Sequence, residues 1–192
     1  MTDPVQVALI VAEALETCLV RYLVGGSLAS AVGGEPRSTL DVDLVVELTE
    51  NDIEPLVVAL GDRFHVDADS LRRAVRERSS ANIIHYETST KVDLFIAGGT
   101  PLDRLQMDRR QRVRVSTNPE RWLHVYTPED IVLQKLRWYR MGNEASDRQW
   151  RDILGVILVQ GERLDHAYLQ DNADAFGVSD LLQRALSESQ VD

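Results

Sequence analysis

The chain has 192 residues but only one cysteine, Cys18, and this scarcity excludes several kinds of structure. A single cysteine cannot form an internal disulfide and offers no second thiolate to a metal site. Charged residues interrupt the longest apolar stretches, so no segment of about 20 apolar residues is available to cross a bilayer. The first residues also lack the basic start of a secretory signal, and we therefore expect a cytoplasmic protein with no membrane partner.

Basic residues are fewer than acidic ones, which gives the chain a net charge of −10 at pH 7. This charge argues against non-specific binding of nucleic acid through a surface that is basic throughout. Arginines nevertheless cluster locally, and the densest group comprises Arg104, Arg109, Arg110, Arg112 and Arg114. The group has two interpretations, a solvated surface with scattered ion pairs or a contact for phosphate groups, and the sequence leaves both open.

Apolar residues make up 44% of the chain, which is enough for a sizeable core. Their spacing predicts a mixed α/β (α+β) core, residues 1–126, followed by a small helical C-terminal region, residues 127–192. Thr127 and Ser146 are each predicted to cap the helix that follows them. The predicted helices are 5–19, 27–32, 51–61, 70–78, 101–107 and four that begin near 128, 147, 164 and 179. The predicted strands are 22–24, 40–47, 64–66, 82–87, 91–96, 112–116 and 122–126.

A glycine-rich turn and a pair of carboxylates carry the first chemical signal. Gly25 and Gly26 allow a tight turn that exposes backbone N–H groups, and Ser27 adds a hydroxyl at the start of a predicted helix. Asp41 and Asp43 follow in an apolar strand pattern, where a spacing of two places both side chains on one face. Mg²⁺ prefers one or two carboxylates together with substrate phosphates. The sequence therefore predicts a site for a metal-bound triphosphate.

Asp93 is the best candidate for a third carboxylate. It lies in an apolar strand pattern, where an ionised side chain is costly unless it is solvated, paired or bound to a metal. Two-metal phosphoryl or nucleotidyl transfer needs carboxylates that hold the metals and one that activates the attacking hydroxyl. The alternative is a solvated aspartate on an edge strand.

Together these residues resemble the signature of the DNA polymerase β-like nucleotidyltransferase superfamily. That signature is a hydrophobic-Gly-[Gly/Ser] turn, a downstream Asp-x-[Asp/Glu] among apolar residues, and a later single carboxylate, and it covers residues 23–96 here. The resemblance implies the nucleotidyltransferase fold, a mixed β-sheet flanked by helices, and one or two Mg²⁺ ions that Mn²⁺ could replace. The implied metal ligands and catalytic residues are Asp41, Asp43 and Asp93. The implied nucleotide-binding residues of the turn are Gly25, Gly26 and Ser27.

A longer pattern is similar to the nucleotidyltransferase toxins of abortive-infection, type IV toxin–antitoxin systems. Arg37 and Thr39 stand before the two aspartates in an Arg-x-Thr-x-Asp-x-Asp string. Residues 130–135 match an Asp-hydrophobic-x-x-x-Lys helix, and residues 148–152 match a helix that contains Arg and Asp. The resemblance implies four further nucleotide-binding residues, Arg37, Thr39, Lys135 and Asp152.

The residues themselves leave more than one interpretation for Lys135 and for Asp152. Lys135 shares a helix face with apolar neighbours, so its ammonium group either reaches past them to water or points at an anion. Asp152 orients Lys135 through a charge-assisted hydrogen bond, contacts the nucleotide directly, or pairs locally with Arg148.

We expect a Mg²⁺-dependent nucleotidyltransferase that moves a nucleoside monophosphate from an NTP to an acceptor hydroxyl and releases pyrophosphate. A toxin of this kind implies tRNA as the acceptor and an antitoxin protein as a partner. Antibiotic nucleotidyltransferases that act on aminoglycosides or lincosamides, and small enzymes that modify another protein, are alternative groups. A non-catalytic nucleotide-binding or partner-binding module is the alternative from a different class, but three neighbouring carboxylates argue against it because they repel one another without a cation.

Overall fold

Alternating burial along two strands shows how the sequence builds the sheet. In the computed structural model of the chain, which describes residues 4–26, 28–29 and 41–189, the apolar residues of β2 (Val42–Val46) and β5 (Thr90–Ile96) are buried at every second position. Successive side chains of a strand point to opposite faces. Asp43 and Asp93 therefore lie on the face opposite the core, where they remain partly exposed.

The described residues divide into two compact units. The first unit contains residues 4–26, 28 and 41–125, and the second contains residue 29 and residues 126–189. All strands belong to the first unit. Besides β2 and β5 they are β1 (Tyr22–Val24), β3 (Phe64–Val66), β4 (Ser80–His85), β6 (Gln111–Thr117) and β7 (Glu120–Val125).

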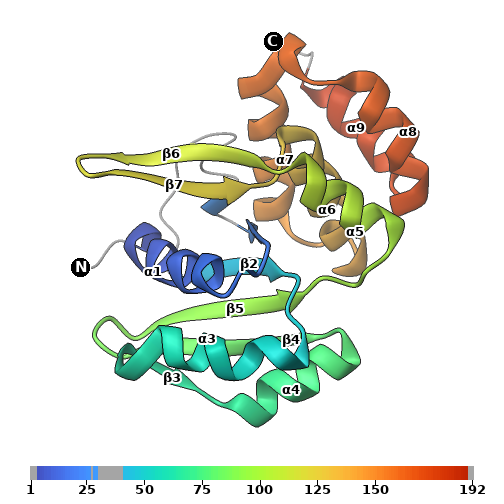
Figure 1. Ribbon diagram of the computed structural model, residues 1–192. Helices are drawn as coiled ribbons and strands as arrows, with labels where there is room; N and C mark the ends of the chain where they lie inside the picture. The colour runs from blue at the N-terminus through green and yellow to red at the C-terminus, as the bar shows by residue number, and fades with distance from the viewer. Residues whose placement is uncertain (1–3, 27, 30–40, 190–192) are drawn as a thin grey trace. The chain divides into compact units, whose positions relative to one another are not determined.

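These strands form a mixed sheet whose order, within the described residues, is β3-β4-β5-β2-β1-β7-β6 (Figure 1). β2 pairs with β5 and β1 pairs with β7 in parallel, whereas the other neighbours are antiparallel. The strands of the two hairpins, β4–β5 and β6–β7, were all predicted from the sequence. The parallel β2–β5 pair connects segments that are distant in the sequence, and it brings together the two strands that carry aspartates.

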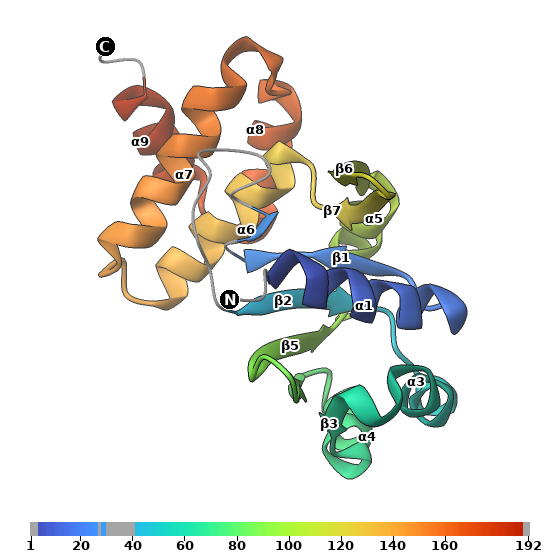
Figure 2. The same cartoon turned by 90° about the vertical axis from the view of Figure 1, so that its left-hand side faces the viewer.

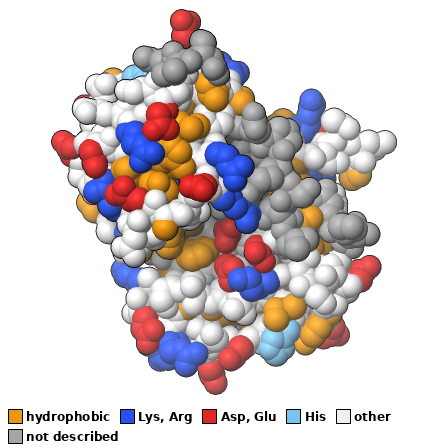
Figure 3. Space-filling view, turned by 180° about the vertical axis from the view of Figure 1, so that it is seen from behind, with side chains coloured by type: hydrophobic (Ala, Val, Ile, Leu, Met, Phe, Trp, Pro, Cys, Tyr) orange, Lys and Arg blue, Asp and Glu red, His pale blue; other side chains and the backbone are white. Residues whose placement is uncertain are grey.

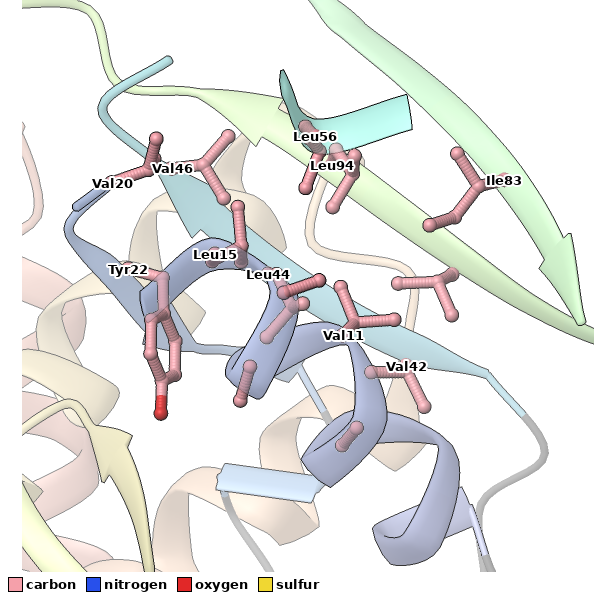
Figure 4. Close-up of a cluster of buried hydrophobic side chains, with 14 of the residues drawn as sticks. Val11, Leu15, Val20, Tyr22, Val42, Leu44, Val46, Leu56, Ile83 and Leu94 are labelled. Carbon is pink, nitrogen blue, oxygen red and sulfur yellow. The ribbon is translucent and has the colours of Figure 1, made fainter. Parts of the chain in front are cut away.

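Helices α1 (Pro4–Thr17), α3 (Ile53–Leu60) and α4 (Ala68–Glu77) cover one face of this sheet (Figures 1 and 2). Leu15 of α1 and Leu56 of α3 belong to the same buried cluster as Leu44 and Leu94 of the sheet, as Figure 4 shows. All four side chains are fully buried. Burial of each such side chain contributes roughly 1.5–3 kcal/mol to stability, so this face of the sheet is fixed by its core.

The second unit is helical in its described part. Its helices are α6 (Pro128–Met141), α7 (Asp147–Gln160), α8 (His166–Phe176) and α9 (Ser179–Glu188) (Figure 2). Helix α5 (Pro101–Arg109) belongs to the first unit. The predicted caps of α6 and α7 are confirmed, since Thr127 Oγ1 accepts a hydrogen bond from the backbone N–H of Asp130 and Ser146 Oγ accepts one from that of Gln149.

The predicted helices and strands are confirmed wherever the structure describes the chain, with small shifts of their ends. The predicted helix 27–32 lies mainly outside the described residues, as do Ser27, Arg37 and Thr39, so the nucleotide-binding roles implied for these three residues stay predictions. Within the described segments, every helix is too short or too polar to span a lipid bilayer.

Candidate active site

The register of β2 and β5 places Asp43 and Asp93 side by side. The two strands run parallel, and Asp43 is the direct neighbour of Asp93. Neighbouring strands lie about 4.8 Å apart, so these side chains project from adjacent positions on the same face. Asp41 precedes Asp43 by two residues and shares that face, where it is exposed. The three predicted carboxylates thus stand on the face of the sheet that α1, α3 and α4 do not cover.

Lys91 lies among these carboxylates and was not singled out from the sequence. Its Nζ is 2.7 Å from Oδ2 of Asp93, with the lysine side chain 46% exposed and the aspartate side chain 19% exposed. The hydrogen bond to Asp93 and the charge of the same carboxylate raise the pKa of Lys91, and the charges of Asp41 and Asp43 act in the same direction. The ammonium group is therefore within the electrostatic field of all three carboxylates. Figure 3, which views the molecule from behind, shows acidic and basic side chains next to one another on this side.

The glycine turn packs directly against one of the carboxylates. The backbone N–H of Gly25 donates a hydrogen bond to the carbonyl oxygen of Asp43 at 2.8 Å and so continues the pairing of β1 with β2. Gly26 has a φ of +57°, and a Cβ at this position would lie 1.7 Å from Oδ2 of Asp43. Any residue with a side chain at position 26 would therefore force the Asp43 carboxylate to move. The turn and the carboxylate that the sequence linked by spacing alone are therefore in contact.

The donor set suits a hard cation. Among the residues that the structure describes, no group of three or more His, Cys, Asp or Glu side chains is arranged so that it could hold a metal ion. Asp93 instead has the Lys91 ammonium as its partner, which is itself a cation on the carboxylate face. Mg²⁺ needs only one or two protein carboxylates, because waters and substrate phosphates complete its octahedral shell. The adjacent pair Asp43 and Asp93 supplies this number of carboxylates, and the metal role of the three aspartates stays a prediction.

Lys135 and Asp152, two of the implied nucleotide ligands, form an ion pair in the second unit. Lys135 Nζ on α6 is 2.8 Å from Oδ2 of Asp152 on α7, and the side chains are only 12% and 15% exposed. The charge-assisted hydrogen bond between Asp152 and Lys135, one of the interpretations that the sequence left open, is confirmed. An ammonium group has three N–H donors, so Lys135 could also donate a hydrogen bond to a phosphate oxygen.

Asp130, which begins the predicted Lys135 helix pattern, has a structural role. Its side chain is fully buried, and its two carboxylate oxygens accept hydrogen bonds from Thr127 Oγ1 at 2.9 Å and from Tyr168 Oη at 2.8 Å. A buried carboxylate is stable when its oxygens are satisfied in this way. The Tyr168 hydrogen bond joins α8 to the start of α6, and the Thr127 hydrogen bond belongs to the cap of α6.

The arginines of residues 104–114 make contacts within the first unit. Arg104 donates to the carbonyl oxygen of Gly99, and Arg110 donates to that of Met107. The guanidinium of Arg112 lies over the ring of Trp122, 4.8 Å from its centre. Arg114 pairs with Glu120 at 3.3 Å. Of the two sequence interpretations, these contacts favour a local structural role for the group.

Comparison with known proteins identifies the fold and leaves the activity open. No protein-family model matches the chain, and no curated protein matches its sequence. Among solved structures, it is similar to an antigenic nucleotidyltransferase-like protein from Paracoccidioides brasiliensis, with a TM-score of 0.50 and 17% identity over 90% of this chain and 91% of the other. It is also similar to the antibiotic-resistance factor ANT(2'')-Ia, with a TM-score of 0.55 and 14% identity over 98% of both chains.

These likenesses, together with the mixed sheet flanked by helices, confirm the predicted nucleotidyltransferase fold. The likenesses concern the fold alone, and they agree with the fold that the resemblance to the polymerase β-like superfamily implies. The closer resemblance to toxin–antitoxin enzymes stays a prediction.

Proposed function

We propose that this protein is a Mg²⁺-dependent nucleotidyltransferase that transfers a nucleoside monophosphate from an NTP to an acceptor hydroxyl. The observation that carries the proposal is the placement of Asp43 and Asp93 on adjacent strands, with Gly26 pressed against the Asp43 carboxylate. A phosphate turn and a carboxylate pair in direct contact are what a metal-bound triphosphate requires.

The chain's own residues have separate tasks in this reaction. Asp41, Asp43 and Asp93 would hold Mg²⁺, which would neutralise charge on the triphosphate. The turn at Gly25 and Gly26 would bind the phosphates, with Gly26 leaving room for the Asp43 carboxylate beside it, and Asp93 would also accept the proton of the acceptor hydroxyl. The acceptor oxygen then forms a bond to the α-phosphorus while the bond from that phosphorus to the α–β bridging oxygen breaks. Pyrophosphate leaves, and Asp93 returns the proton to water.

Lys135 and Asp152 complete the proposal as ligands of the nucleotide. Asp152 fixes the ammonium group of Lys135 through their 2.8 Å hydrogen bond. A lysine held in this way is preorganised as a point charge for a phosphate oxygen, because it does not lose further side-chain freedom on binding.

The candidate acceptor molecules differ in charge, and this difference distinguishes them. The net charge of −10 and the carboxylates on the open face of the sheet favour a cationic small molecule, such as an aminoglycoside. A phosphate-rich acceptor such as tRNA, with an antitoxin protein as partner, is the alternative that the toxin resemblance implies. It requires arginines that are now engaged in local contacts to become available.

The proposal is tested by incubating the protein with each α-labelled NTP, Mg²⁺ and separate pools of total tRNA, aminoglycosides and lysate proteins. We expect label in one pool with the wild-type protein and none with Asp43→Asn. Asp62→Asn, the same change at an exposed position of the 3₁₀ turn Gly61–Arg63, is the matched control and should retain activity. Absence of label from every pool with every NTP, in a protein that binds NTP, would favour the non-catalytic module instead.

A further inference from the structure

Lys91 is an unusual residue for this chain and for its position. Lys91 and Lys135 are the only lysines in the sequence, and the remaining basic residues apart from histidine are all arginines. Each lysine is paired with an aspartate that the sequence had assigned to the candidate site. An ammonium group is a compact point charge, whereas a guanidinium is a broad planar fork. The ammonium group at position 91 is therefore closer to a metal ion in size and charge distribution than a guanidinium group would be.

The strand register explains why this ammonium group meets several carboxylates. Lys91 and Asp93 are two residues apart on β5 and share a face. On the neighbouring strand, Val42 is the partner of Val92 and Asp43 is the partner of Asp93. Asp41 therefore stands at the level of Lys91, and the four side chains occupy neighbouring positions on one face. Carboxylates this close repel one another unless a cation lies between them.

We propose that Lys91 is a resident counter-cation of the carboxylate face, which pairs with Asp93 in the metal-free protein and must leave it when a divalent metal binds. This inference rests on the proposed function, because it assumes that the same carboxylates hold the metal. The Lys91 side chain is 46% exposed, so its ammonium group can move into water at small cost. The pair would keep the carboxylates in place before the metal arrives, and it would also weaken metal binding by competition.

The inference predicts that removal of the lysine charge strengthens metal binding. In Lys91→Gln, the metal no longer displaces an ammonium group and meets a more negative face. An exposed ion pair is worth up to about 1 kcal/mol, so we expect Mn²⁺ to bind about fivefold more tightly. Lys91→Arg retains the charge and should bind Mn²⁺ with an affinity close to that of the wild-type protein.

Isothermal titration calorimetry with Mn²⁺, in the absence of nucleotide, measures this affinity directly and needs no turnover. Arg73→Gln is the matched control, since Arg73 is an exposed residue of α4, the helix that covers the opposite face of the sheet. It changes the net charge of the protein by the same amount and should leave Mn²⁺ affinity nearly unchanged. An unchanged or weaker affinity in Lys91→Gln overturns the inference.

A second measurement follows the lysine side chains of the wild-type sequence, and a charge-conserving variant serves only to assign their signals. Reductive methylation with a ¹³C label keeps the charge of each lysine, and the two lysine signals in an NMR spectrum can be assigned by the loss of one in Lys91→Arg. We expect saturating Mg²⁺ to shift the Lys91 signal markedly and to leave the Lys135 signal in place. A Lys91 signal that does not move when the metal binds overturns the inference.

The failure of the inference and the failure of the proposed function give different results. If the wild-type protein binds no Mn²⁺, and Asp43→Asn behaves identically, the metal site and the inference both fail. If Mn²⁺ binds, Asp43→Asn abolishes binding and Lys91→Gln has no effect, the metal site stands and only the role of Lys91 is wrong.

Discussion

The ion pair between Lys91 and Asp93 lies on an open strand face, whereas the pair between Lys135 and Asp152 joins two helices. Their lengths are nearly equal, 2.7 Å and 2.8 Å. The lysines differ in exposure, 46% in the first pair and 12% in the second, whereas the aspartates are similar at 19% and 15%. The exposed lysine can leave its aspartate at little cost, because water solvates the freed ammonium group. The buried lysine cannot, because its charge would have to leave its partner without gaining water. Burial, and not distance, therefore separates an exchangeable contact from a fixed one.

The largest effect is expected from the aspartate of the open pair. Asp93→Asn removes the group proposed to accept the acceptor proton and to bind the metal, so the rate of nucleotidyl transfer should fall by about 10³-fold. The free energy of unfolding should change by less than about 1 kcal/mol, because the side chain is not part of the core. Single-turnover transfer and urea unfolding measure the two quantities. Loss of activity with an equal loss of folded protein would remove the distinction between the two pairs.

The lysines should differ in their contribution to stability. Lys135→Met removes a mostly buried ammonium group from its aspartate and should lower the free energy of unfolding by about 3 kcal/mol. Lys91→Met should lower it by less than about 1 kcal/mol, because the ammonium group that it removes is already half exposed to water. Urea unfolding of both variants gives the comparison in one experiment. Equal losses would mean that the difference in burial has no energetic consequence.

Replacement of both partners of the buried pair separates its structural task from its proposed binding task. Lys135→Met combined with Asp152→Leu removes both charges of the pair, so most of the roughly 3 kcal/mol lost in the single variant should return. NTP affinity should remain weak in the double variant, because no ammonium group is left for the triphosphate. Wild-type affinity in the stable double variant would show that Lys135 only supports the fold.

The smallest effect concerns the turn that adjoins the open pair. Gly26→Ala and Gly177→Ala both place a Cβ at a positive φ, +57° and +65°, and each should cost about 1–2 kcal/mol of stability. Only Gly26→Ala also displaces the Asp43 carboxylate, whereas nothing lies within 4 Å of a Cβ at Gly177. We expect weaker Mn²⁺ binding in Gly26→Ala alone. Equal metal affinity in the two variants would mean that contact with the turn does not position Asp43.

The sequence predicted the elements and the candidate aspartates because both depend on local patterns. A spacing of two on an apolar strand placed Asp41 and Asp43 on one face, and an isolated acid in another strand singled out Asp93. The register that joins Asp43 to Asp93 could not be read in advance, since no turn connects the two parallel strands and fixes their alignment. Lys91 was missed for the same reason, because only the register shows how many carboxylates surround it.

Nucleotidyl transfer itself is tested most directly by supplying the same NTP with its label at either the α- or the γ-phosphate. With Mg²⁺ and the acceptor pool that becomes labelled, the α-label should appear on the acceptor. The γ-label should appear only in released pyrophosphate, and both products should vanish in Asp43→Asn. A γ-label on the acceptor, or an equally rapid reaction in Asp43→Asn, would contradict nucleotidyl transfer at this site.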